Sequence, residues 1–202
     1  QTSTYAFEDT AALIDHMRRK EDKKPLLRGE YGRYGNPTQR VAERKLAALD
    51  GGEEALLYAS GMCAITSTLL TLLSGGDHLI LTDDCYRRTR EFCLTYLKRF
   101  GIESTMVPMG DYGVMEAAVK DNTRMIFSET PTNPYMRILD LEQVVAIAQR
   151  HDITTFVDAT FATPCNQRPL DYGIDLVTHS VTKYLAGHND LLGGVAVGDP
   201  GA

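Results

Sequence analysis

Hydrophobic and polar positions alternate along most of the chain in a pattern typical of short buried strands separated by helices. Short apolar runs predict strands at residues 55–58, 78–82, 104–107, 124–128, 154–157, 174–179 and 193–197. Helical periodicity predicts helices at residues 40–50, from 61 onward, 84–100 and 140–151. This alternation predicts an α/β fold with a mostly parallel sheet flanked by helices on both faces.

The first 39 residues depart from this pattern and predict an N-terminal arm. A helical stretch at residues 9–20 leads into a polar run that ends at Pro25. The segment 29–38 then places glycines among tyrosines, which suits neither a strand nor a helix and favours an ordered functional loop. We therefore expect an arm with an inter-subunit loop at residues 1–39, and a large domain at 40–202.

Composition and charge narrow the possible functions. The net charge of −6 disfavours a nucleic-acid partner, and no apolar run is long enough to predict a membrane span. The N-terminal residues lack the layout of a signal peptide. The four cysteines form no C-x-x-C pair and the histidines are isolated, which predicts neither a metal site nor a disulfide framework. We expect a soluble intracellular protein with no nucleic-acid or membrane partner.

One lysine follows a predicted strand and lies close in sequence to two hydroxyl side chains. Lys183 comes after Ser180 and Thr182, and the strand before them ends at His179. A lysine attacks an aldehyde through its neutral amine, and burial lowers the lysine pKa enough to supply that form. Two hydroxyl groups at this spacing suit a phosphate held beside the lysine. The alternative is an ordinary surface lysine after a strand.

Two further positions suit the same chemistry. Asp158 ends another predicted strand 25 positions before Lys183, so both residues are expected at the same edge of the sheet, where its carboxylate could hold a pyridinium nitrogen. Gly61 and Met62 begin a helix after Ser60, and a helix N-terminus binds phosphate through free N–H groups. The alternatives are a loop-capping aspartate and a plain N-cap.

Other candidates follow strands or lie in the arm. Tyr86 could stack on a pyridine ring and transfer protons, and Asn133 could donate to a phenolate oxygen. The alternatives are a half-buried tyrosine at a helix start and a turn asparagine. Tyr31 and Arg33 could grip a phosphate, including that of a neighbouring subunit, or form a loop with incidental charge.

Six segments of the chain share their order with a known family. They are YGRYGNPT at 31–38, ASGM at 59–62, DCYRRT at 84–89, ETPTNP at 129–134, VDATFATP at 157–164 and HSVTKYLAGHND at 179–190. In these segments the chain resembles the Cys/Met-metabolism enzymes that depend on pyridoxal 5'-phosphate (PLP). The resemblance implies a fold-type-I PLP-dependent transferase fold.

The resemblance also implies a role for each candidate. Lys183 would bind PLP covalently and act in catalysis with Tyr86, which would stack on the ring. Asp158 would contact the pyridine nitrogen. The phosphate would be held by Gly61, Met62, Ser180 and Thr182. Tyr31 and Arg33 would reach the cofactor of an adjacent subunit, in a homodimer or homotetramer with shared active sites.

The segments GEYGRYGNPT, ASGMCA, DCYRRTR and FATPCNQ resemble plant-type cystathionine γ-synthases in particular. This implies γ-replacement on an activated homoserine with cysteine to give cystathionine, and a cytoplasmic or plastid location. Cystathionine γ-lyase, methionine γ-lyase and O-acylhomoserine sulfhydrylase are the alternatives. Family members have a C-terminal domain that we do not find here. A further alternative is therefore a catalytically incomplete fragment that needs another chain.

Overall fold

The computed structural model describes residues 3–24, 26 and 28–199. The chain forms two compact units, residues 1–43 and 44–202. Our expected division into 1–39 and 40–202 remains a prediction, because helix α2 (Pro37–Asp50) spans both boundaries.

The first unit contains helix α1 (Thr10–Glu21) and the short 3-10 helix η1 (Gly32–Tyr34). The Asp9 side chain caps α1 by accepting a hydrogen bond of 2.7 Å from the backbone N–H of Ala12. His16 is buried on α1, with its Nε2 atom 3.3 Å from a carboxylate oxygen of Glu30. The arm therefore has a local structure of its own.

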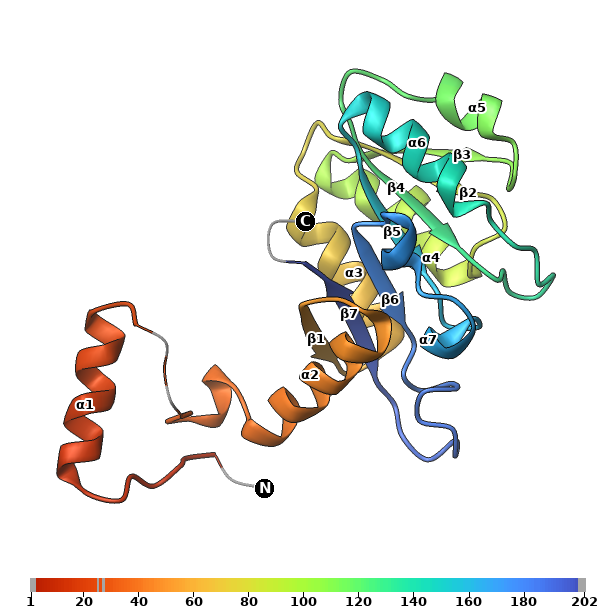
Figure 1. Ribbon diagram of the computed structural model, residues 1–202. Helices are drawn as coiled ribbons and strands as arrows, with labels where there is room; N and C mark the ends of the chain where they lie inside the picture. The colour runs from red at the N-terminus through yellow and green to blue at the C-terminus, as the bar shows by residue number, and fades with distance from the viewer. Residues whose placement is uncertain (1–2, 25, 27, 200–202) are drawn as a thin grey trace. The chain divides into compact units, whose positions relative to one another are not determined.

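The second unit is built on one seven-stranded sheet, which confirms the predicted α/β class (Figure 1). Its strands are β1 (Glu54–Tyr58), β2 (His78–Thr82), β3 (Glu103–Val107), β4 (Thr123–Glu129), β5 (Thr154–Asp158), β6 (Leu176–His179) and β7 (Gly194–Gly198). They lie in the order β1-β7-β6-β5-β4-β2-β3. Only β7 pairs antiparallel with its neighbours, β1 and β6, so the sheet is mostly parallel as predicted.

Helices cover both faces of the sheet (Figure 1). On one face, α5 (Tyr112–Ala117) and α6 (Leu141–His151) pack on strand residues such as Ile126 and Val157. On the other face, α3 (Gly61–Leu72) packs on Leu79, Phe127 and Phe156. A third cluster joins Ala47 of α2 to Ala55 of β1 and to Val195 and Val197 of β7. The central residues of the buried strands are apolar because both faces of the sheet are covered, whereas polar residues lie toward the strand ends.

The predicted helix at 84–100 is wrong in its start and its continuity. The segment divides into α4 (Arg87–Glu91), a π-helical turn η2 (Phe92–Tyr96) and a 3-10 turn η3 (Leu97–Phe100). Its interior residues Cys93 and Leu97 pack into the α3 cluster, so tertiary contacts override the regular helical repeat. Three short elements were not predicted: α5, α7 (Thr163–Asn166) and η4 (Pro169–Tyr172).

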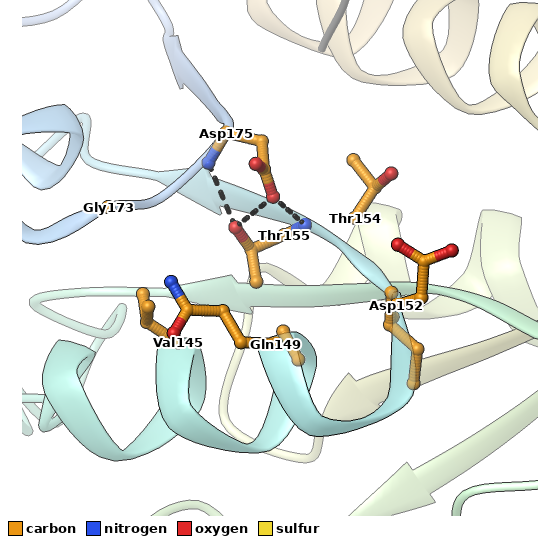
Figure 2. A pocket seen from close by; sticks show the side chains of 9 residues that line it. Val145, Gln149, Asp152, Thr154, Thr155, Gly173 and Asp175 are labelled. Atoms are coloured by element: carbon orange, nitrogen blue, oxygen red, sulfur yellow. Dashed lines mark hydrogen bonds between the residues drawn. The ribbon is translucent and has the colours of Figure 1, made fainter.

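A cavity of about 310 Å³ lies at the start of β5, where α6 ends (Figure 2). Asp175 accepts hydrogen bonds of 2.7 Å from both the backbone N–H and the hydroxyl of Thr155 in its wall. This is the amino end of the parallel strands, and no predicted site residue lines it. None of the described helices combines the length and the apolar character that crossing a membrane requires.

Candidate active site

The predicted site residues of the second unit gather at the carboxyl ends of four neighbouring strands. Tyr86 follows β2, Asn133 follows β4, Asp158 ends β5 and Lys183 follows β6. These strands are adjacent in the sheet, in the order β6-β5-β4-β2. In open α/β sheets, ligands bind beyond this edge.

Asp158 is buried at this edge, with 7% of its surface exposed. Its Oδ1 atom accepts hydrogen bonds from the backbone N–H of Thr160 at 3.0 Å and from the Thr160 hydroxyl at 2.5 Å. Among the described residues, no hydrogen bond reaches Oδ2. Burial raises the pKa of Asp158, and the bonds from Thr160 lower it less. A cationic N–H group placed against Oδ2 would favour the ionised carboxylate.

Thr160 connects Asp158 to the lysine loop. Its hydroxyl donates to Asp158 and accepts from the backbone N–H of Ser180 at 2.8 Å. The loop is fixed again where the Thr182 hydroxyl accepts from the backbone N–H of Gly193 at 3.0 Å. The sequence did not reveal these linking roles, since a threonine after a strand has many uses.

Lys183 lies on a turn after β6, where its backbone N–H donates to the Ser180 carbonyl at 3.0 Å. The residue is exposed, so the burial expected for an activated lysine is not observed. The turn extends beyond the end of the strand at His179. The structure does place Lys183 on the turn after β6, the strand next to the one that ends in Asp158, as predicted.

The N-terminus of α3 lies against the same loop. The Ser60 hydroxyl caps this helix by accepting from the backbone N–H of Cys63 at 3.1 Å. A Cβ atom added to Gly61 would lie 2.7 Å from the Cβ of Ser180. Glycine is therefore required for this close approach, which brings the first N–H groups of a helix beside the hydroxyls of the lysine loop. Met62 is partly buried against the α3 cluster, and the Thr89 hydroxyl contacts its sulfur at 3.6 Å.

Glu129, which we did not predict as a site residue, holds Tyr86 and Asn133. Its Oε2 atom accepts a hydrogen bond of 2.6 Å from the backbone N–H of Tyr86. Its Oε1 atom accepts one of 2.8 Å from the backbone N–H of Asn133. Glu129 stands opposite Asp158 in the β4–β5 pairing. A glutamate that ends a buried strand was the available signal in the sequence.

Burial and the neighbouring Asp158 raise the pKa of Glu129 to about 8, while the N–H groups of Tyr86 and Asn133 act in the opposite direction. Two carboxyl groups so close together disfavour a second negative charge. Tyr86 itself is 41% exposed, so its ring is accessible to a ligand at this edge.

Tyr31 and Arg33 belong to the first unit. The Arg33 guanidinium lies over the Tyr31 ring, 4.9 Å from its centroid, and 5.3 Å from that of Tyr34. Such stacking fixes the plane of the guanidinium and leaves its N–H groups able to bind an anion. Their part in a phosphate site remains a prediction.

These residues fit a ligand with a cationic ring nitrogen and a phosphate. Asp158 has a free carboxylate oxygen within the described structure, and the Gly61–Ser180 contact forms a cradle that a side chain would fill. Known proteins provide an independent comparison. The chain matches the Cys/Met metabolism PLP-dependent enzymes over residues 1–201.

The chain belongs to this family. It is 46% identical over 198 residues to cystathionine gamma-synthase 1, chloroplastic, of Arabidopsis thaliana, which covers 98% of this chain and 34% of that protein. It is 47% identical over 167 residues to cystathionine beta-lyase MetC of Bacillus subtilis, which covers 83% of this chain and 43% of that protein. L-methionine gamma-lyase of Pseudomonas putida is 46% identical over 168 residues, a match that covers 83% of this chain and 42% of that protein.

Solved structures agree with this assignment. A protein assigned as O-acetylhomoserine (thiol)-lyase from Campylobacter jejuni matches with a TM-score of 0.89 and 34% identity, covering 98% of this chain and 48% of that chain. One lysine of that protein carries pyridoxyl phosphate. Cystathionine gamma-lyase from Lactobacillus plantarum matches with a TM-score of 0.86 and 37% identity. The fold is therefore that of fold-type-I PLP enzymes, and the chain spans between a third and a half of the length of these relatives.

Proposed function

We propose that the chain is part of an enzyme that replaces the γ-substituent of an activated homoserine with cysteine to give cystathionine. The observation that carries this proposal is the extent of the similarity. The match to the Arabidopsis cystathionine gamma-synthase covers 98% of the chain, whereas the matches to the beta-lyase and the methionine gamma-lyase cover 83%. The residues DCYRRT at 84–89 also favour a synthase, since a methionine γ-lyase would place cysteine where Arg88 stands.

Bound PLP would supply an electron sink for the bond electrons of the substrate Cα. In our proposal Lys183 anchors the cofactor through its amine and, once released, removes the Cα proton. The Asp158 carboxylate keeps the ring nitrogen protonated, and Thr160 fixes that carboxylate through Oδ1. Tyr86 and Lys183 then shuttle the Cβ proton. The γ-substituent would leave with its bonding electrons, the cysteine sulfur would lose its proton and add at Cγ, and the two protons taken from Cα and Cβ would return to those carbons to give cystathionine.

The phosphate would be held from two sides. The N-terminus of α3, at Gly61 and Met62, supplies N–H groups and the positive end of a helix dipole. Ser180 and Thr182 supply hydroxyls from the lysine loop, which the Gly61–Ser180 contact brings alongside. Asn133 would donate to the phenolate oxygen from the loop after β4.

Cystathionine γ-lyase, methionine γ-lyase and O-acylhomoserine sulfhydrylase remain alternatives, because they would use the same cofactor residues. A steady-state assay separates them by whether cystathionine accumulates or is consumed when activated homoserine and cysteine are supplied together. Accumulation supports the synthase. Only α,β-chemistry on cysteine would exclude γ-replacement.

Arg87 and Arg88 bear on the choice of leaving group. They directly follow Tyr86 and, with Arg90, line a cavity of about 460 Å³. Arg88 also pairs with Glu91 at 2.7 Å on the helix surface. We propose that the two arginines favour an O-phospho over an O-acyl ester. Replacing Arg88 with Met should lower kcat/KM for the phosphate ester at least tenfold more than for an acyl ester. Equal losses would exclude this role.

Tyr31 and Arg33 would complete the active site of an adjacent subunit in a homodimer or homotetramer. Mixing an Arg33→Ala protein with a Lys183→Ala protein tests this sharing. If sites are shared, hybrid assemblies recover activity that neither variant has alone. If each chain serves its own site, the mixture stays inactive.

The experiment that tests the proposed function is a visible spectrum with PLP, followed by borohydride reduction and peptide mass mapping. We expect a yellow chromophore that is trapped on Lys183, and its loss in Lys183→Ala but not in Lys98→Ala. If the chain alone binds no PLP, the measurement is repeated on a longer polypeptide that includes the further residues its relatives have. Failure there too would overturn the enzyme assignment.

A further inference from the structure

One buried carboxyl group joins two loops that the proposed function uses. Glu129 is 5% exposed and ends β4. One of its oxygens accepts from the backbone of Tyr86, on the loop after β2, and the other accepts from the backbone of Asn133, on the loop after β4. Each carboxyl oxygen is thus engaged by a different loop.

The position of Glu129 in the sheet directs it toward the cofactor residues. It is the register partner of Asp158 on the neighbouring strand, so the two side chains point to the same face. The α3 cluster, which includes Phe127 and Phe156, lies on that face two residues earlier on each strand. Glu129 therefore sits beside the proposed contact to the ring nitrogen.

A glutamine could not reproduce these bonds. A carboxyl group offers two acceptor oxygens, whereas an amide offers one oxygen and one NH₂ group. In either orientation, the amide nitrogen of a glutamine at this position would face the backbone N–H of Tyr86 or of Asn133. A carboxylic side chain of this length is required to hold both loops.

We propose that Glu129 is a positioning residue that sets Tyr86 against the ring of the cofactor and Asn133 against its phenolate oxygen. The inference rests on the proposed function, which assigns those two contacts. In this role Glu129 would contact neither the substrate nor the ring. It acts only through the two backbones that it holds.

The same loops have a second connection, which allows the proposal to be tested without unfolding the protein. The Thr132 hydroxyl donates to Asp84 at 2.8 Å, and the Arg137 guanidinium lies 3.6 Å from the same carboxylate. Loss of one Glu129 bond should therefore shift Tyr86 or Asn133 locally, while Asp84 keeps the loops together.

The test measures PLP affinity and the visible circular dichroism of the bound cofactor in Glu129→Gln. The matched control is Glu116→Gln, since Glu116 is an exposed glutamate paired with Arg150. We expect Kd for PLP to rise about tenfold or more in Glu129→Gln, because one buried backbone N–H loses its acceptor and faces an NH₂ group instead, with a weakened visible signal. Far-ultraviolet circular dichroism should not change. Glu129→Asp, which keeps the carboxyl group but shortens the side chain, should show the same defect and provides a second variant if Glu129→Gln does not fold.

The decisive comparison repeats Glu129→Gln in a Tyr86→Ala/Asn133→Ala background. If Glu129 acts through these two residues, its substitution there should change Kd less than about twofold, because coupled residues are not additive. An undiminished effect in that background, or a Glu129→Gln protein with wild-type Kd and visible signal, would overturn the proposal. Absence of PLP binding in the wild type would instead overturn the proposed function on which it rests.

Discussion

Replacing Gly61 with alanine should damage the cofactor site through a single added methyl group. The new Cβ would lie 2.7 Å from the Cβ of Ser180 and 2.9 Å from its Cα. Carbon atoms in contact prefer about 3.5–4.0 Å, so either α3 or the lysine loop must move by roughly 1 Å. Backbone atoms are involved on both sides, so a change of rotamer cannot relieve the clash.

The expected cost in stability follows from that displacement. Overpacking of this kind typically lowers the free energy of unfolding by about 1–3 kcal/mol. With a urea m-value of about 2 kcal/mol/M, the midpoint should fall by roughly 0.5–1.5 M. The two halves of the phosphate cradle also separate, so Kd for PLP should rise at least about tenfold, or ~1.4 kcal/mol.

Urea unfolding and PLP titration of Gly61→Ala measure both effects. Gly113→Ala is the matched control, because a Cβ at Gly113 would meet only Asp111 Oδ1 at 3.6 Å, an ordinary contact. The control should unfold at or slightly above the wild-type midpoint and bind PLP equally well. The reasoning would be refuted if Gly61→Ala kept both the wild-type midpoint and the wild-type Kd.

Three further predictions concern polar side chains of the second unit. Because burial raises the pKa of Glu129 to about 8, above its unfolded value, the native state binds more protons, so this residue's contribution to stability should fall as pH rises from about 5 to 8. In Glu129→Gln, the urea midpoint should depend less on pH across that range than it does in the wild type. An equal pH dependence in the two proteins would contradict the raised pKa of Glu129. The buried His179 Nε2 lies 3.0 Å from both carboxylate oxygens of Asp50, so His179→Leu should cost about 3–5 kcal/mol by leaving that carboxylate unpaired. Adding Asp50→Leu should recover part of the loss, and a further loss in the double variant would argue against the pairing. Ser60→Ala should cost about 1 kcal/mol by removing the cap of α3, and an unchanged urea midpoint would show that the cap is not needed.

The sequence predicted the sheet well because its strands carry a strong local signal. Strands buried on both faces, such as β2 and β4, have three consecutive apolar residues at their centre, and strands alternate with helices along the chain. Elements of four to six residues, such as α5 and α7, were missed because they are too short to show a helical period. The segment 84–100 was predicted as one helix because its breaks depend on packing against α3.

The sequence predicted where candidate site residues lie when each of them ends or directly follows a predicted strand. A lysine, an aspartate and a helix start at the carboxyl ends of strands pointed to Lys183, Asp158 and Gly61. The supporting residues Thr160 and Glu129 were not identified, because their roles depend on which backbone N–H or hydroxyl group comes within reach in the folded chain. The exposure of Lys183 was likewise decided by a turn that extends past the strand.

The pairing of β1 with β7 has a consequence for how the chain acquires its structure. Among the described strands, β1 (Glu54–Tyr58) is hydrogen-bonded only to β7 (Gly194–Gly198), which is made much later during synthesis. Contacts between residues so far apart in sequence form slowly, because the entropic cost of closing the long loop between them precedes any stabilisation by the contacts. On a ribosome, β1 and the helix start that follows it would remain unanchored until the last described strand has emerged. The helix end proposed to bind phosphate would then be among the last parts of the sheet edge to become ordered.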